Sequence, residues 1–166
     1  SYELLAESEL SKQFYSKAAK FPMTYYGQLA FNKINPGGNF ELKDQSFFDN
    51  EYEREFKKNK LIKHLILLKE LNATQLGKDI FKHLANLNIE KGSEVLAADL
   101  ATTLERYDFA IQISKKASYE KRFYNKYNYP IIATPKVINN KTMPKSEVIL
   151  AIIRQESEFD KSANSW

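Results

Sequence analysis

The stretch ATQLGKDIFKHLANL, residues 73–87, decides the fold class of this 166-residue chain. Apolar residues recur in it every three or four positions, at Ala73, Leu76, Ile80, Leu84 and Leu87. A helix of 3.6 residues per turn brings such residues to one face, so the stretch predicts an amphipathic helix with one buried side. A helix of this length is not stable alone, and it must therefore pack against other helices.

The sequence before this stretch carries similar helical patterns. Residues 2–20 predict a first helix, and Pro22 suits the first turn of a second one, where its missing N–H costs nothing. The second helix is expected to end before the breaker at residues 35–38, Asn-Pro-Gly-Gly. Residues 47–71 then predict one long helix.

The sequence after it continues in the same way. Ser93 can cap a helix, and Phe109 and Ile113 mark a further short one. The face of the helix after Ser93 is predicted to carry Leu96, Leu100 and Leu104. No fixed period of about 34 residues, as in a regular helical repeat, is found. The predicted fold is therefore all-α, an irregular array of antiparallel helices.

The composition agrees with a helical protein of one domain or two small ones. Hydrophobic residues make up 43% of the chain and charged residues 28%, which is enough to bury a core. The chain has 5 glycines and 5 prolines, fewer than many strands joined by tight turns would need.

Cysteine and histidine usage excludes several kinds of chemistry. The chain has no cysteine, which excludes disulfides, thiolate metal sites and cysteine nucleophiles. His64 and His83 are far apart in the sequence and show no metal-ligand spacing. We therefore expect no metal site and no cofactor.

A net charge of +4 raises the question of nucleic-acid binding. One stretch, residues 115–127, mixes cations with aromatic residues, as single-stranded nucleic-acid sites do. However, Tyr119, Phe123 and Tyr127 are four residues apart, which is typical of a buried helix stripe. The spacing favours packing, so we expect no nucleic-acid partner.

The longest wholly apolar run, residues 148–153, is far shorter than the roughly 20 residues that a bilayer requires. No transmembrane segment is therefore predicted. The chain opens on a pattern typical of a helix already under way, without a leader, so we expect it to be a piece of a longer protein.

Glu156 stands at the end of the most apolar predicted helix, which begins near residues 144–146. Ile149 and Ile153 lie seven and three residues before it and share its face. Partial desolvation and the negative end of the helix dipole would both favour the neutral acid, which is the form that protonates a leaving oxygen. A helix-terminal glutamate that bends out to water is the alternative.

The sequence around Glu156 resembles the Glu-Ser motif that opens the catalytic domain of soluble lytic murein transglycosylases. The match covers residues 151–160, AIIRQESEFD, and continues over residues 163–165, ANS. Residues 25–30, YYGQLA, are similar to a segment late in the family's helical superhelix. Tyr129-Pro130 and residues 143–146, MPKS, are similar to the entry into its catalytic domain.

The resemblance implies a fold and an organisation. Residues 1–38 would be the end of a helical superhelix, residues 39–129 a helical linker domain, and residues 130–166 the incomplete start of a lysozyme-like catalytic domain. The first helix of that domain would lie at the C-terminus of the chain. The family continues with a Gly-Leu-Met-Gln segment and a sugar groove that this chain does not contain, so we expect the 166 residues alone to be inactive.

The resemblance also implies a function. The family cleaves the β-1,4 bond between N-acetylmuramic acid and N-acetylglucosamine in peptidoglycan glycan strands, and it leaves a 1,6-anhydro product. Glu156 would be the catalytic residue, first as acid and then as base, and Ser157 would shape the substrate site. Glu158 and Asp160 would be bystanders. The protein would be an exported bacterial lyase of the periplasm.

A second hypothesis, based on the stacked helices, is a protein-interaction module of the helical-repeat type without catalysis. Nucleic-acid binding through residues 115–127 is the third and least favoured.

Overall fold

A computed structural model describes residues 8–38, 40–42 and 44–164 of the chain. Within these ranges the structure is mostly helical, with one short two-stranded hairpin, so the all-α prediction is confirmed at this level. The chain divides into two compact units, residues 1–43 and residues 44–166. The domain boundaries expected from the sequence, at 38/39 and 129/130, remain predictions.

The first unit contains two packed helices, α1 (Ser8–Ala18) and α2 (Tyr25–Ile34). The expectation that Pro22 opens the second helix is wrong, because α2 starts three residues later, behind Thr24. The Thr24 hydroxyl accepts a hydrogen bond from the N–H of Gly27 at 3.0 Å and so caps the helix. Gly27 is buried against this turn, where a Cβ would lie 1.9 Å from the carbonyl oxygen of Phe21.

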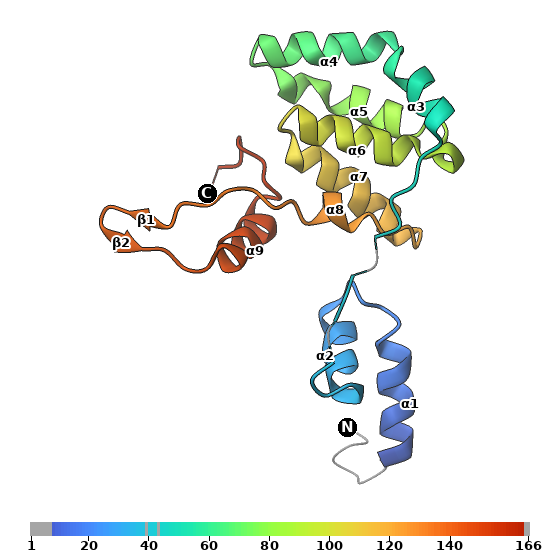
Figure 1. Ribbon diagram of the computed structural model, residues 1–166, viewed down its shortest axis with the longest axis vertical. Coiled ribbons are helices and arrows are strands. Elements are labelled where there is room, and N and C mark those ends of the chain that lie inside the picture. Colours follow the sequence, from blue (N-terminus) through green and yellow to red (C-terminus); the bar gives the residue numbers. More distant parts are fainter. Residues whose placement is uncertain (1–7, 39, 43, 165–166) are drawn as a thin grey trace. The chain divides into compact units, whose positions relative to one another are not determined.

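The second unit is built around an array of helices. In chain order its α-helices are α3 (Asn50–Lys57), α4 (Lys60–Glu70), α5 (Lys78–Ala85), α6 (Ser93–Thr103), α7 (Tyr107–Tyr119) and α8 (Asn125–Asn128). Two 3₁₀ turns, Thr74–Gly77 and Ile89–Lys91, precede α5 and α6. Each of α5, α6, α7 and α8 packs against its neighbour in sequence (Figure 1).

The core of this array lies along α6. Val95, Ala97, Ala98 and Ala101 of α6 are almost completely buried, and small side chains allow the helices on both sides to approach closely. From the neighbouring helices, the core receives Leu65, Phe81, Leu84 and Phe109, among other residues. The prediction that Leu96 and Leu104 are buried is confirmed, and Leu100 is partly buried against the core.

Two details of the helix prediction are wrong. Residues 47–71 form two helices, because the chain breaks at Lys58 and Asn59, and the Asn59 side chain caps α4 by accepting from the N–H of Leu61 at 3.0 Å. In residues 73–87, Leu84 is buried and Ile80 is partly buried against the core, as the spacing predicts, but Leu76 and Leu87 are exposed and Phe81 is buried instead. The 3₁₀ turn before α5 shifts the buried face away from the face that the spacing indicated.

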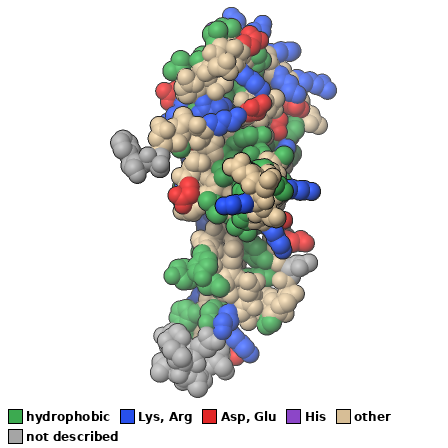
Figure 2. Space-filling model, turned by 90° about the vertical axis from the view of Figure 1, so that its left-hand side faces the viewer, with side chains coloured by type: hydrophobic (Ala, Val, Ile, Leu, Met, Phe, Trp, Pro, Cys, Tyr) green, Lys and Arg blue, Asp and Glu red, His purple; other side chains and the backbone are tan. Residues whose placement is uncertain are grey.

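The last part of the second unit is a hairpin followed by a helix. Strands β1 (Val137–Ile138) and β2 (Lys141–Thr142) pair antiparallel, and α9 spans Ser146–Glu156, as the sequence predicted. None of the eleven residues of α9, all of which the structure describes, is buried. Figure 2 shows hydrophobic side chains on the face that carries the hairpin and α9. Two apolar residues of α9, Val148 and Ile152, are about half exposed.

Across the described part of the chain, every helix is too short or too polar to span a lipid bilayer.

Candidate functional site

Glu156 is the last residue of α9, and its side chain is exposed. Ile149 and Ile153, which were expected to desolvate it, are themselves only partly buried. The expectation of a desolvated carboxyl group is therefore wrong for the residues that the structure describes. The physical reason is that a shared helix face gives desolvation only where another element covers that face, and the described elements leave the end of α9 open.

Arg154 attaches α9 to the helical array. Its Nε donates to the carbonyl oxygen of Asn128 at 2.9 Å, and its Nη2 donates to the side-chain Oδ1 of the same residue at 2.8 Å. Asn128 is the last residue of α8 and is buried. The planar guanidinium thus makes two hydrogen bonds to one residue, which fixes the direction of the arginine as well as its position.

Glu158 makes a second attachment, just beyond the helix end. Its Oε1 lies 2.8 Å from Nζ of Lys115 on α7 and 3.3 Å from Nη1 of Arg154. Burial alone would raise the pKa of Glu158, but the hydrogen bond and charge of Lys115 and the charge of Arg154 outweigh it and hold the pKa below its usual value. We call Arg154, Glu158, Lys115 and Asn128 the helix-end clamp.

The turn after α9 folds back on the array. Glu158 and Phe159 both have positive φ, 50° and 65°. Residues other than glycine adopt such a backbone conformation only at a cost in free energy. The Phe159 side chain is 8% exposed, and its ring centroid lies 6.2 Å from that of Tyr107 on α7. Burial of this ring and the ion pair of Glu158 together hold the turn in its strained conformation.

Ser157 lies on the wall of a cavity of about 380 Å³, together with Ile153, Phe159 and Tyr107. Its hydroxyl donates to the carbonyl oxygen of Ile153 at 3.1 Å, a bond back to its own helix. Glu156 is not among the residues that line this cavity. The structure therefore separates the two predicted site residues, with Ser157 facing the cavity and Glu156 facing solvent.

Asp160 organises the chain that leaves the turn. Its Oδ1 accepts from the N–H of Ser162 at 2.9 Å and from the Ser162 hydroxyl at 2.7 Å. These bonds from Ser162 lower the pKa of Asp160. Asp160 thus orders the chain at Ser162, whereas Glu158 holds the helix end; that both are bystanders to catalysis stays a prediction.

The sequence missed the helix-end clamp, although one part of it had a signal. Arg154 and Glu158 are four residues apart with opposite charge, a spacing that brings side chains together on or beside a helix. Their partners Asn128 and Lys115 are far away in sequence, and nothing local indicates that they meet α9.

The stripe expected at Tyr119, Phe123 and Tyr127 does not form. Helix α7 ends at Tyr119, which is 77% exposed, and a separate helix begins at Asn125. Tyr127 is buried, as expected, and its hydroxyl donates to Asp99 at 3.1 Å. Residues 119–127 therefore do not share one helical register, because the chain turns at residues 120–124.

Three of the five cations of residues 115–127 form ion pairs within the unit. Lys115 pairs with Glu158, and Lys126 pairs with Asp99 at 3.3 Å. Arg122 binds Glu94 with two hydrogen bonds, of 2.9 and 3.0 Å. These contacts give the basic stretch a structural role, and the absence of a nucleic-acid partner remains a prediction.

The histidines show no grouping with other ligand types. Nδ1 of His64 lies 2.9 Å from the carbonyl oxygen of Lys60, one turn earlier in α4, and His83 is exposed on α5. Among the residues that the structure describes, no three histidine, aspartate or glutamate side chains gather as metal ligands do.

No model of a protein family, no curated protein and no solved structure matches the chain.

Proposed function

We propose that this chain belongs to a lytic transglycosylase of peptidoglycan, in which Glu156 is the catalytic residue. The proposal rests on one observation: the glutamate of the Glu-Ser motif is the last residue of α9, the helix that the sequence predicted for it. On this proposal residues 1–38 end a superhelix, residues 39–129 form a linker domain, and α9 is the first helix of a lysozyme-like domain.

The proposed reaction needs one carboxyl group. Glu156 gives its proton to the glycosidic oxygen between N-acetylmuramic acid and N-acetylglucosamine, and the bond to the anomeric carbon breaks. The resulting carboxylate then takes the proton of the muramoyl 6-hydroxyl, whose oxygen attacks the anomeric carbon and closes the 1,6-anhydro ring. No water is consumed, so the second carboxylate of an ordinary glycosidase is not required.

The exposure of Glu156 sets a condition on this reaction. A general acid works best where water is excluded and the substrate is held, and both need residues that cover the end of α9. We therefore propose that the 166 residues are inactive without such a cover. Ser157, on the wall of the neighbouring cavity, would contribute to the shape of the sugar site. The substrate would be glycan strands in the bacterial periplasm.

The test uses the protein that contains this segment together with the rest of its catalytic domain. Purified peptidoglycan is digested, and 1,6-anhydromuropeptides are measured by mass spectrometry. Glu156→Gln is expected to abolish their release. Glu147→Gln, which removes an exposed carboxylate from the first turn of the same helix, is the matched control and should release them normally. Release that persists in Glu156→Gln would remove Glu156 from the mechanism.

The exposed apolar residues of α9 favour a second candidate, a protein-interaction module without catalysis. Val148 and Ile152 are about half exposed, at 48% and 56%, on a helix that packs beside an array of helices. The residues encoded after Trp166 separate the two candidates. A Gly-Leu-Met-Gln segment would support the enzyme, and a stop codon would support the module.

A further inference from the structure

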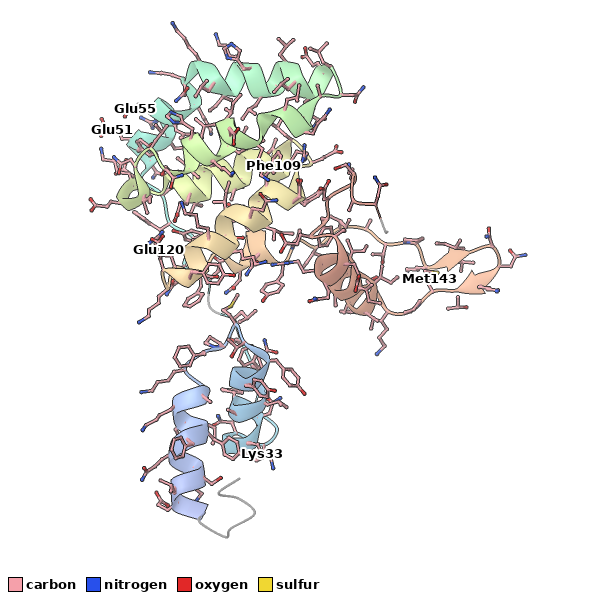
Figure 3. The ribbon with its side chains drawn as sticks, turned by 180° about the vertical axis from the view of Figure 1, so that it is seen from behind. Lys33, Glu51, Glu55, Phe109, Glu120 and Met143 are labelled. Carbon is pink, nitrogen blue, oxygen red and sulfur yellow. The ribbon has the colours of Figure 1, made fainter. Side chains whose placement is uncertain are left out.

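A cavity of about 320 Å³ lies in the helical array, between residues of α5 and α7, and no residue of α9 lines it. Its apolar wall is formed by Phe81 and Ala85 of α5 and by Phe109 and Ile113 of α7. The rings of Phe81 and Phe109 are 5.2 Å apart, and Figure 3 shows Phe109 within the array. The volume falls at the small end of the range for ligand pockets, and an apolar lining is typical of such pockets.

Three lysines stand at the mouth of this cavity. Lys78 and Lys82 come from α5 and Lys116 from α7, and all three are exposed. Nζ of Lys82 is 3.7 Å from Asp79, but the Asp79 side chain is 95% exposed, so this pair is weak. Nζ of Lys116 donates to the neutral amide oxygen of Asn86 at 3.1 Å. The mouth therefore keeps most of its positive charge.

One acid lines the cavity, and its charge is already satisfied. Glu94 is 2% exposed, and its two carboxylate oxygens accept hydrogen bonds from Arg122 at 2.9 and 3.0 Å. The hydroxyl of Tyr124 adds a third, at 3.1 Å. Of the mouth lysines, Lys78 also acts on Asp160, whose pKa it helps to lower. Lys82 and Lys116 are thus the cations best placed to meet a ligand.

We propose that this cavity binds a small amphipathic anion, a carboxylate carried on a short acyl or aryl body. The apolar body lies against Phe81 and Phe109, and the carboxylate lies between Lys82 and Lys116. The volume corresponds to about ten groups the size of a water molecule, which suits a short chain or a single ring. It does not admit a helix about 10 Å across, so a small molecule fits better than a protein segment. The proposal is independent of the transglycosylase function.

The probe for the test is octanoate, with 1-octanol and octylamine as matched neutral and cationic molecules. Each is titrated into the ¹⁵N-labelled chain, and amide shifts are followed by NMR. Octanoate is expected to give saturable shifts around Phe81, Ala85, Phe109 and Ile113, with a dissociation constant on the order of 1 mM. The other two molecules should bind more weakly, by about threefold or more, because the lysines favour a negative head group.

Two double variants separate the lysines at the mouth from the overall charge. Lys82→Gln/Lys116→Gln is expected to weaken octanoate binding by about threefold or more. Lys58→Gln/Lys63→Gln removes the same charge from two exposed positions outside the cavity, one just after α3 and one in α4, and should leave binding unchanged. The proposal is overturned if octanoate gives no saturable shifts, if the shifts map to α9, if octylamine binds equally well, or if both variants bind alike.

Discussion

Removal of Arg122 tests how the turn between α7 and α8 is held. The variant Arg122→Met leaves the Glu94 carboxylate, which is 2% exposed, with the hydrogen bond from the Tyr124 hydroxyl but without its ion pair. Breaking a fully buried ion pair costs about 3–5 kcal/mol, because the remaining charge stays desolvated. The Arg122 side chain is 30% exposed, so water can partly replace it, and we expect a loss of about 2–3 kcal/mol. For a unit of this size, that corresponds to a decrease in Tm of about 10 °C.

The assay is urea unfolding of the 166-residue chain followed by circular dichroism at 222 nm. Arg54→Met, at an exposed position of α3, is the matched control and should change the free energy of unfolding by less than about 0.5 kcal/mol. The double variant Glu94→Met/Arg122→Met should recover much of the loss, since no buried charge remains. If Arg122→Met loses no more than Arg54→Met, the buried carboxylate does not depend on the arginine and the reasoning is wrong.

Three further perturbations follow from the structure. Burial, and next the charge of Glu94, raises the pKa of Tyr124 to about 12, above the unfolded value of about 10. The stability that the neutral phenol contributes is therefore present below pH 10 and is lost as the pH rises towards 12. Tyr124→Phe should make the free energy of unfolding, measured in urea, fall less steeply over this alkaline range. Lys115→Met should cost about 0.5 kcal/mol at pH 7, and the difference should shrink in acid as Glu158, whose folded pKa is lowered, becomes protonated. Gly92→Ala should cost about 2–4 kcal/mol in the same assay, because φ is +89° and the new Cβ would lie 2.4 Å from a backbone oxygen.

Matched controls accompany these variants. Tyr119→Phe removes an exposed hydroxyl and should retain the wild-type alkaline decline. Lys121→Met removes an exposed lysine near Lys115 in sequence, and its effect should not depend on acid pH. Gly37→Ala introduces the same methyl group at φ +76°, but into open space, and should cost about 1 kcal/mol. If a control changes the measured stability, or its pH dependence, as much as its test variant does, the corresponding explanation is refuted.

The helix in residues 73–87 shows what the sequence could and could not predict. The period of three to four residues correctly indicates a helix that packs in an array. It indicates the buried side only in part: Leu84 is buried as predicted, but the stretch also makes a close contact at Gly77, where a Cβ would lie 2.6 Å from Cδ2 of Leu65 on another helix. Leu76 lies in the 3₁₀ turn before α5 and is exposed, whereas Phe81, four residues after Gly77, lies in the core.

In the candidate site, too, the features that depend on nearby residues could be predicted from the sequence, and those that depend on distant residues could not. The bounds of α9 and the place of Glu156 at its end depend on neighbouring residues, and the sequence predicted both. The solvation of Glu156 depends on whatever packs against the helix end, so spacing alone could not predict it.

The helix-end clamp gives the proposed catalytic glutamate a fixed backbone even while its side chain is exposed. Arg154 and Glu158 stand two residues before and two residues after Glu156, and both are held to the helical array. If the proposed function is right, elements that cover the helix end would therefore pack around a glutamate whose Cα position is already fixed. The covering elements would then need to exclude water and hold the sugar. The helix-end clamp would already position the backbone of the acid, and this positioning is its contribution to preorganisation.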